Sequence, residues 1–267
     1  MEMTEPLRGS RLVHPLDNRN LSFEKYIDHN TLEGVPAAVD FSKKKRTPWR
    51  RMGNWTANNC TCATAGHMIE CWTANATHED IILTREVMEV YIALSGYNPE
   101  THENDDGLYY QDVLKYWRKI GIGDHKIKAF TTVDLKNPKL VRAAVYTFGG
   151  AYLGMELPNT IIKQELWDVK PGGLTGDRAV GSFGGHAVNI VGYDENFIYV
   201  ISWGKVKRLT WEFLETYGYV LYAVMSEDFF KAGVTPLGLS LNALEDDLMT
   251  LSKAKKTLER QLGEQHD

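Results

Sequence analysis

The hydrophobic pattern predicts three helices in the first half of the chain. The first runs to about residue 76. One face of it carries a stripe of small and apolar side chains: Cys62, Ala65, Gly66, Ile69 and Trp72. Apolar residues three and four apart predict a second helix over residues 84–95 and a third over residues 110–120, which Gly121 ends. We therefore expect this half to be mainly helical.

The pattern changes near residue 125. Alternating or continuous apolar runs predict strands over residues 127–131, 151–157, 187–193 and 197–202. A short helix is expected over residues 137–147, with Pro138 at its first position, and long loops over residues 158–185. A helix-rich half followed by a strand-rich half predicts an α+β fold with two lobes, divided near residue 125, and a cleft between them.

Composition narrows the function classes. The 267 residues are 43% hydrophobic and 24% charged, as in an ordinary globular protein, and the net charge of −5 argues against nucleic acid as a partner. A basic run at residues 43–46 is interpreted as a solvated turn. No apolar stretch approaches the ~18 residues of a membrane helix, so no membrane association is expected. Met1 to Leu16 lacks the apolar core of a signal peptide, which predicts that the protein is not secreted by one.

The cysteines point to a nucleophile rather than to disulfides or metal. There are three, an odd number, and Cys60 and Cys62 are separated by one residue with no CxxC pair. Neither a disulfide framework nor a metal or cofactor site is therefore predicted. Cys60 follows a polar loop at the start of the first helix, where the helix dipole lowers a thiol pKa. It lies outside the apolar stripe and is free to face a cleft, whereas Cys62 is expected to be buried but remains the rival nucleophile.

A histidine and a tryptophan supply the second chemical feature. His186 opens a buried strand after two glycines, and it is either a structural histidine or the partner of a cysteine elsewhere in the chain. Trp203 follows Ser202 at the end of the next strand. It is either a core tryptophan or a ring that shields and orients an imidazole.

From about residue 36 to residue 225, the chain resembles the papain-like cysteine peptidase family. The motifs that carry the likeness follow in order: Pro36 to Phe41, Cys60 with Ile69-Glu70, Gly107 to Tyr110, Phe148 to Ala151, Gly185 to Tyr193, and Ser202 to Gly204. The combination of residues 59–63 with residues 184–188 is similar to a little-characterised branch in bacteriophage and bacterial genomes. The resemblance implies a papain-like domain over residues 36–230, with a helical lobe at about 36–125 and a β-rich lobe at about 126–230.

Carried over to this sequence, the resemblance makes Cys60 the nucleophile and His186 its general base. Asn54 stands six residues before the cysteine, where the family places the glutamine of its oxyanion hole. The family's asparagine, which orients the histidine, has no counterpart here. Depending on the motif used for alignment, either Ser202 or Ile201 occupies its position, and only the serine offers a hydroxyl. The family's disulfides are absent.

The two ends of the chain carry a separate prediction. Residues 1–35 are expected to form an extended arm, and residues 231–267 a C-terminal segment with an amphipathic helix. Its leucines recur at heptad spacing: Leu241, Leu244, Leu248, Leu251, Leu258 and Leu262. This helix either lies on its own domain or binds a partner.

Two function hypotheses follow. In the first, the chain is a cysteine hydrolase that cleaves peptide, isopeptide or amide bonds in a peptide or protein substrate. In the second, it is a catalytically weak or inactive papain-fold structural protein, such as a phage virion component. Its terminal arms would then self-associate or bind phage structural proteins. The expected location is the host cytoplasm or the virion.

Overall fold

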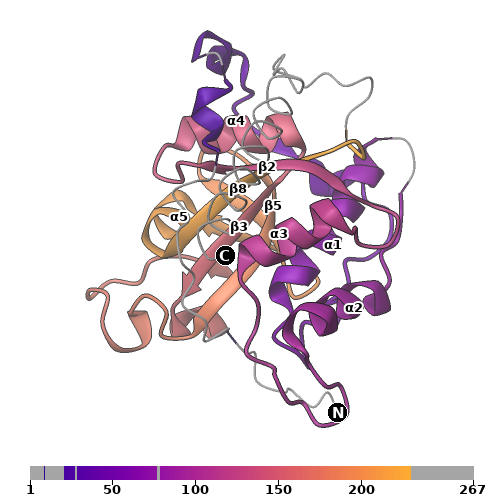
Figure 1. Cartoon of the computed structure of the whole chain (residues 1–267). Helices are drawn as coiled ribbons and strands as arrows, with labels where there is room; N and C mark the ends of the chain where they lie inside the picture. Colours follow the sequence, from indigo (N-terminus) through magenta and orange to yellow (C-terminus); the bar gives the residue numbers. More distant parts are fainter. Residues whose placement is uncertain (1–8, 10–20, 28, 77–78, 230–267) are drawn as a thin grey trace, which may run out of the picture.

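One mixed sheet runs through the molecule (Figure 1). The computed structural model describes residues 9, 21–27, 29–76 and 79–229. Across the sheet, the strands are β2 (Ile127–Val133), β8 (Gly218–Ser226), β3 (Ala151–Leu157), β5 (Gly184–Tyr193), β6 (Phe197–Ser202), β7 (Lys205–Thr210) and β4 (Leu166–Trp167). Strand β1 (Val39–Asp40) pairs with the far end of β5. The pairs are antiparallel except for β4 with β7.

The two faces of the sheet belong to two hydrophobic cores, because successive side chains of a strand point to opposite faces. In β8, for example, Leu221 and Ala223 lie in one core, while Val220 and Tyr222 lie in the other. A single strand therefore contributes to both halves of the molecule.

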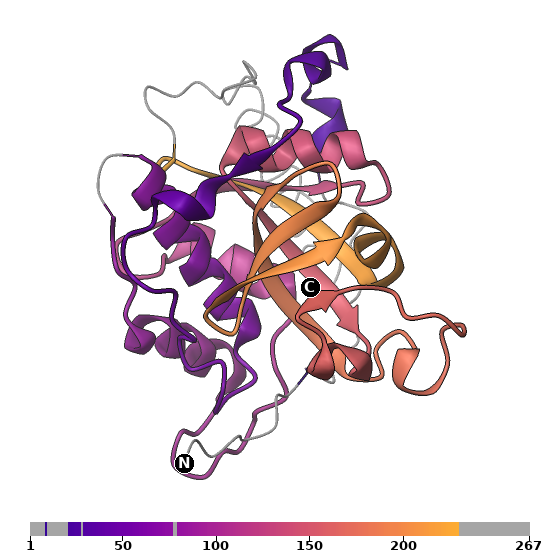
Figure 2. The ribbon, with the colours of Figure 1, turned by 180° about the vertical axis from the view of Figure 1, so that it is seen from behind.

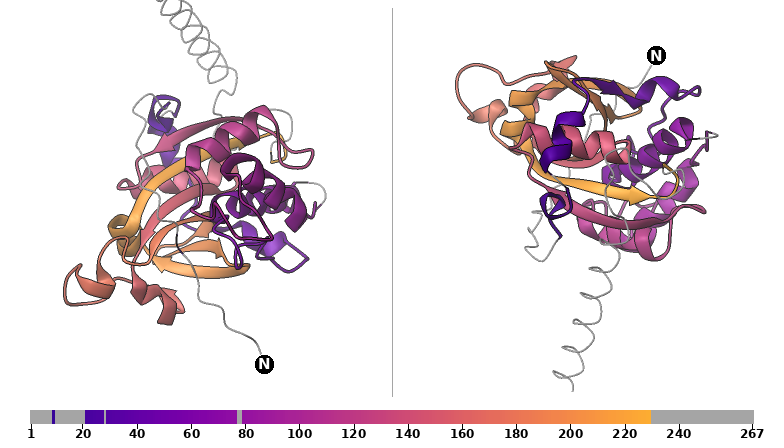
Figure 3. Two further views of the ribbon diagram at one scale, coloured as in Figure 1. Left: turned by 60° about the horizontal axis from the view of Figure 1, so that its bottom comes forward. Right: turned by 90° about the horizontal axis from the view of Figure 1, so that it is seen from above.

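Helices cover each face. The helices α1 (Cys60–Asn75), α2 (Thr84–Ser95) and α3 (Tyr110–Lys119) contribute to the same core and lie together on one side of the sheet (Figures 1 and 3). The helices α4 (Pro138–Phe148) and α5 (Trp211–Tyr217) contribute to the other core. The predicted α+β architecture is confirmed, with a helical part built from the first half of the chain.

The N-terminal segment is tied to the body. Its described part holds two short 3-10 helices, η1 (Phe23–Lys25) and η2 (His29–Gly34), where the sequence predicted extended chain, and η2 lies beside α4 (Figure 2). Phe23 is buried and makes an edge contact with Phe148, with 5.8 Å between the ring centroids. Burial of this ring favours the turn over an extended arm. The rest of the arm and residues 231–267 lie outside the described residues.

Further 3-10 turns are η3 (Phe41–Lys44), η4 (Asn159–Lys163) and η5 (Gly176–Arg178). The turns η4 and η5 and strand β4 lie within residues 158–185, which the sequence predicted as long loops.

Candidate active site

Cys60 is the first residue of α1, as predicted, and its side chain is 5% exposed. The backbone N–H groups of Cys60, Thr61 and Ala187 lie close enough to its sulfur to lower the pKa of the thiol. Ala187 follows His186 on β5, and helix α1 and strand β5 pack against each other. The contact brings the helix start and the histidine strand together, although they are distant in sequence.

Burial controls the charge of this thiol. The three N–H groups and the helix N-terminus favour a thiolate. Loss of hydration outweighs them and raises the pKa of Cys60 to about 11. The sequence-based expectation of a lowered pKa is therefore wrong for this structure, because it counted the dipole but not the burial.

His186 is held by the end of β6. Its Nε2 atom lies 2.9 Å from Ser202 Oγ, and its ring stacks on Trp203 with 4.3 Å between centroids and 19° between planes. Ile201 instead pairs with Asn189 inside the sheet. Of the two alternatives for the residue that orients the histidine, the structure brings Ser202 to the ring.

The second ring nitrogen of His186 faces no partner. Within the described part of the chain, Nδ1 is buried and makes no hydrogen bond. Burial lowers the pKa of His186 to about 3, so the ring is neutral near pH 7. No direct hydrogen bond joins Cys60 and His186 among these residues, and the two meet through Ala187. The resting arrangement is a neutral thiol beside a neutral imidazole.

Asn54 is close to the helix start, but its amide is engaged locally. The side chain is buried, and Nδ2 donates to the Ala57 carbonyl over 3.4 Å, a long hydrogen bond. Asn59 occupies the N-cap position of α1 but makes no side-chain cap hydrogen bond, and its Nδ2 instead donates to the Met52 carbonyl over 2.8 Å. The two amides therefore shape the loop before Cys60, and the role of Asn54 in an oxyanion hole stays a prediction.

A carboxylate clamps this loop to its neighbour. Asp105 Oδ1 accepts hydrogen bonds from the Asn58 backbone N–H and from the Tyr91 hydroxyl, each over 2.7 Å. The Tyr91 hydroxyl in turn accepts from the Gly107 N–H over 3.2 Å. The clamp joins the residues before Cys60 to α2 and to the loop before α3. No sequence motif marks it, because the partners lie on three separate segments.

We expect the Asp105→Ala variant to lose about 2–3 kcal/mol of unfolding free energy, since it leaves a buried donor without its charged acceptor. Tyr91→Phe should lose less, about 1 kcal/mol, because it removes one neutral donor. Urea denaturation of both variants and of the double variant measures the coupling. A double variant whose loss equals the sum of the two single losses would contradict a shared clamp.

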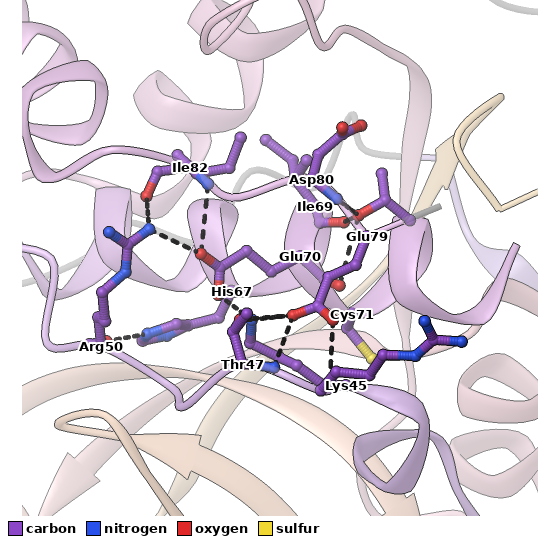
Figure 4. Close-up of polar contacts among 12 residues, drawn as sticks. Lys45, Thr47, Arg50, His67, Ile69, Glu70, Cys71, Glu79, Asp80 and Ile82 are labelled. Carbon is purple, nitrogen blue, oxygen red and sulfur yellow. Dashed lines mark hydrogen bonds and ion pairs between the residues drawn. The ribbon is translucent and has the colours of Figure 1, made fainter. Parts of the chain in front are cut away.

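The rest of α1 is anchored by a buried ion network (Figure 4). Glu70 is fully buried and lies 3.1 Å from Lys45 Nζ and 3.2 Å from Arg50. Lys45 also contacts Glu79 over 2.8 Å. The interpretation of residues 43–46 as a solvated turn is wrong for Lys45, whose side chain is 1% exposed. Its acidic partners come from distant parts of the sequence.

The remaining candidates have other roles. Cys62 and Cys71 are completely buried, as the apolar stripe predicted for Cys62. His67 lies 2.7 Å from the Arg50 carbonyl through Nε2, away from the cysteine. No cluster of three metal-ligating side chains occurs within residues 9, 21–27, 29–76 and 79–229, and no helix in that part is long and apolar enough to cross a membrane.

Neither family models nor curated protein sequences match this chain. Its fold, however, is that of the papain-like cysteine proteases. Xylellain, a cysteine protease from Xylella fastidiosa, is 11% identical with a TM-score of 0.62, covering 83% of this chain and 98% of xylellain. Procathepsin B S9 from Trypanosoma congolense is 10% identical with a TM-score of 0.56, covering 83% and 87%. The Carica candamarcensis protease CMS1MS2 is 15% identical with a TM-score of 0.50, covering 72% and 99%.

Proposed function

We propose that this chain is a cysteine hydrolase that cleaves peptide, isopeptide or amide bonds. One observation carries the proposal: His186 is fixed by Ser202 and Trp203 with its Nδ1 atom unpartnered, while the next residue contacts the Cys60 sulfur. An imidazole held in this way can accept a thiol proton. Similarity of the fold to solved cysteine proteases supports the same reaction class.

The chemistry starts from neutral groups. As Sγ of Cys60 attacks the carbonyl carbon, its proton passes to Nδ1 of His186, and Nε2–H donates to Ser202 Oγ. The imidazolium then protonates the leaving nitrogen as the carbon–nitrogen bond breaks. Water, deprotonated by the neutral ring, hydrolyses the thioester. Because both groups are buried, each is neutral alone, and the charged pair forms only when proton transfer creates both charges together.

The carbonyl oxygen needs donors as it becomes negative. The Cys60 backbone N–H at the helix start supplies one. Asn54 Nδ2 supplies a second if the bound substrate draws it from the Ala57 carbonyl, a change favoured by the length of that 3.4 Å hydrogen bond.

Three variants test the proposal on a fluorophore-labelled denatured protein substrate. Cys60→Ala should abolish hydrolysis, and His186→Ala should lower the rate ~10²–10⁴-fold, the usual contribution of general acid–base catalysis. Cys62→Ala, on the same helix, is the matched control and should retain activity. Hydrolysis that survives Cys60→Ala would refute the assignment.

Ser202→Ala should lower kcat roughly tenfold with little change in KM, because one hydrogen bond orients the imidazole without touching the substrate. Ser202→Thr, which retains the hydroxyl, is expected to restore most of the rate. An unaltered kcat in Ser202→Ala would show that stacking on Trp203 is sufficient to position the ring.

A second candidate function is a binding or structural role without turnover. The buried Cys60 thiol and its raised pKa favour it. In that case the terminal arms would mediate self-association or contacts with phage structural proteins. Failure of peptide-based thiol reagents to modify Cys60, together with oligomers that depend on residues 231–267, would support this candidate.

A further inference from the structure

Glu156 carries a carboxylate that no other described group neutralises. It lies on β3 and is half-buried. Among the residues that the structure describes, its side chain makes neither an ion pair nor a hydrogen bond, and burial raises its pKa. Its backbone carbonyl accepts a hydrogen bond from the Gly181 N–H over 3.2 Å. A partly buried carboxylate without a protein partner is incompletely hydrated and gains from pairing with a cation.

The position of Glu156 relates it to the candidate active site. On β3 it pairs with Gly185, the residue before His186. Two residues earlier on the same face, Gly154 pairs with Ala187, whose N–H contacts the Cys60 sulfur. Residues i and i+2 of a strand lie roughly 7 Å apart on one face. The Glu156 side chain is therefore the next one along this face of β3 after Gly154, which pairs with Ala187.

Aromatic side chains lie near Glu156. The Tyr110 ring lies directly over Gly154, where an added Cβ would come within 2.5 Å of it. Tyr110 and Tyr219 are both close enough to Glu156 for its charge to raise their pKa values. Gly185 adds no side chain on its cross-strand side. A carboxylate beside aromatic rings is a combination that attracts cations.

Polypeptide already passes this end of β5. Gly9 packs so closely there that an added Cβ would lie 2.6 Å from the Phe183 carbonyl oxygen and 2.9 Å from the Gly184 Cα. In the sequence, Gly9 is flanked by Arg8 and by Arg11 two residues later. A main chain is thus compatible with this surface.

We propose that Glu156 binds the cationic side chain of a lysine or arginine in the peptide that Cys60 attacks. The inference rests on the proposed hydrolase function and adds its substrate class. A guanidinium or ammonium group would pair with the carboxylate and lie against the tyrosine rings. A single carboxylate without further oxygen ligands does not suit a metal ion.

Matched peptides test the proposal. Tripeptides with a C-terminal vinyl sulfone would carry arginine, or its neutral isostere citrulline, at each position in turn. Labelling of Cys60 would be followed by mass spectrometry on the full chain and on Glu156→Gln. Glu195→Gln, an exposed carboxylate in the β5–β6 turn, is the charge-matched control. At one position, arginine should react about tenfold faster than citrulline, as expected for one charge-assisted hydrogen bond. Glu156→Gln should remove this ratio, and Glu195→Gln should retain it.

A ratio near one at every position, or a ratio that persists in Glu156→Gln, would overturn the proposal. If no probe labels Cys60, the hydrolase assignment fails, but the charge recognition is still tested by binding. Fluorescence anisotropy of the same peptides without the vinyl sulfone, measured on Cys60→Ala, should show the same arginine preference and its loss in the Cys60→Ala/Glu156→Gln double variant. Equal affinities of the arginine and citrulline peptides would refute the role of Glu156 independently of the thiol.

Discussion

Alkylation of Cys60 by iodoacetamide is expected to accelerate about tenfold for each pH unit between pH 7 and pH 10, because only the thiolate reacts. Burial raises the pKa of Cys60 to about 11, so the thiolate fraction remains small and grows in proportion to hydroxide over this range. The expected gain over three pH units is therefore ~10³-fold. A stable thiolate–imidazolium pair predicts a different profile, with a nearly constant rate from below pH 5 to pH 8.

The measurement needs a chain in which Cys60 is the sole cysteine. Cys62→Ala combined with Cys71→Ala provides it, since both side chains are completely buried small residues of α1. Circular dichroism at each pH verifies that the fold persists. Adding His186→Ala should leave the slope unchanged, because the neutral ring does not stabilise the thiolate in the resting protein. A flat profile that becomes steep in His186→Ala would contradict the neutral pair and indicate an ion pair.

The pattern of the chain predicted the elements that place the candidate nucleophile and base. The first helix begins at Cys60 because a polar loop leads into a continuous apolar stripe, and the stripe identified Cys62 as a core residue. His186 was predicted on a strand by the apolar run that follows it. These are local properties of the sequence, and local patterning is what determines an element's type.

The contacts between elements that are distant in the sequence could not be predicted from local patterns. Whether Ser202 or Ile201 faces the histidine depends on strand register, and a shift of one residue reverses the face of every side chain. The prediction of a low thiol pKa failed for a related reason, because burial depends on how β5 packs over α1. Lys45 was read as solvated because its partners Glu70 and Glu79 are remote in sequence.

Local patterns also failed to predict the strand and helix that follow residue 202. Strand β7 exposes half of its six side chains and carries three basic residues, so it lacks the apolar run that marked β5 and β6. Helix α5 has only seven residues, and a helix this short makes fewer than two turns, so its apolar residues do not form a recognisable helical pattern. Both elements form because they complete the sheet and its second core, which is a tertiary effect.

Replacing Glu70 with alanine should lower the free energy of unfolding by about 3–5 kcal/mol, the cost of leaving a buried charge unpaired. Glu70 is fully buried and forms an ion pair with Lys45. Its Oε1 accepts hydrogen bonds from Arg50 and from the Ile82 N–H, each over 3.2 Å. Without it, Glu79 is the one charged partner that the Lys45 ammonium retains among the described residues. Chemical denaturation monitored by tryptophan fluorescence gives the loss directly.

Two comparison variants separate the network from a simple loss of charge. Lys43→Ala removes an exposed lysine, 3.6 Å from Asp40, and should change stability by less than about 0.5 kcal/mol. The double variant Glu70→Leu/Lys45→Met removes both buried charges and should be more stable than Glu70→Ala, because apolar groups of similar size need no partner. A Glu70→Ala loss below about 1 kcal/mol would mean that the remaining charges reach water at little cost. The anchoring of α1, and with it the position of Cys60, would then rest on apolar packing alone.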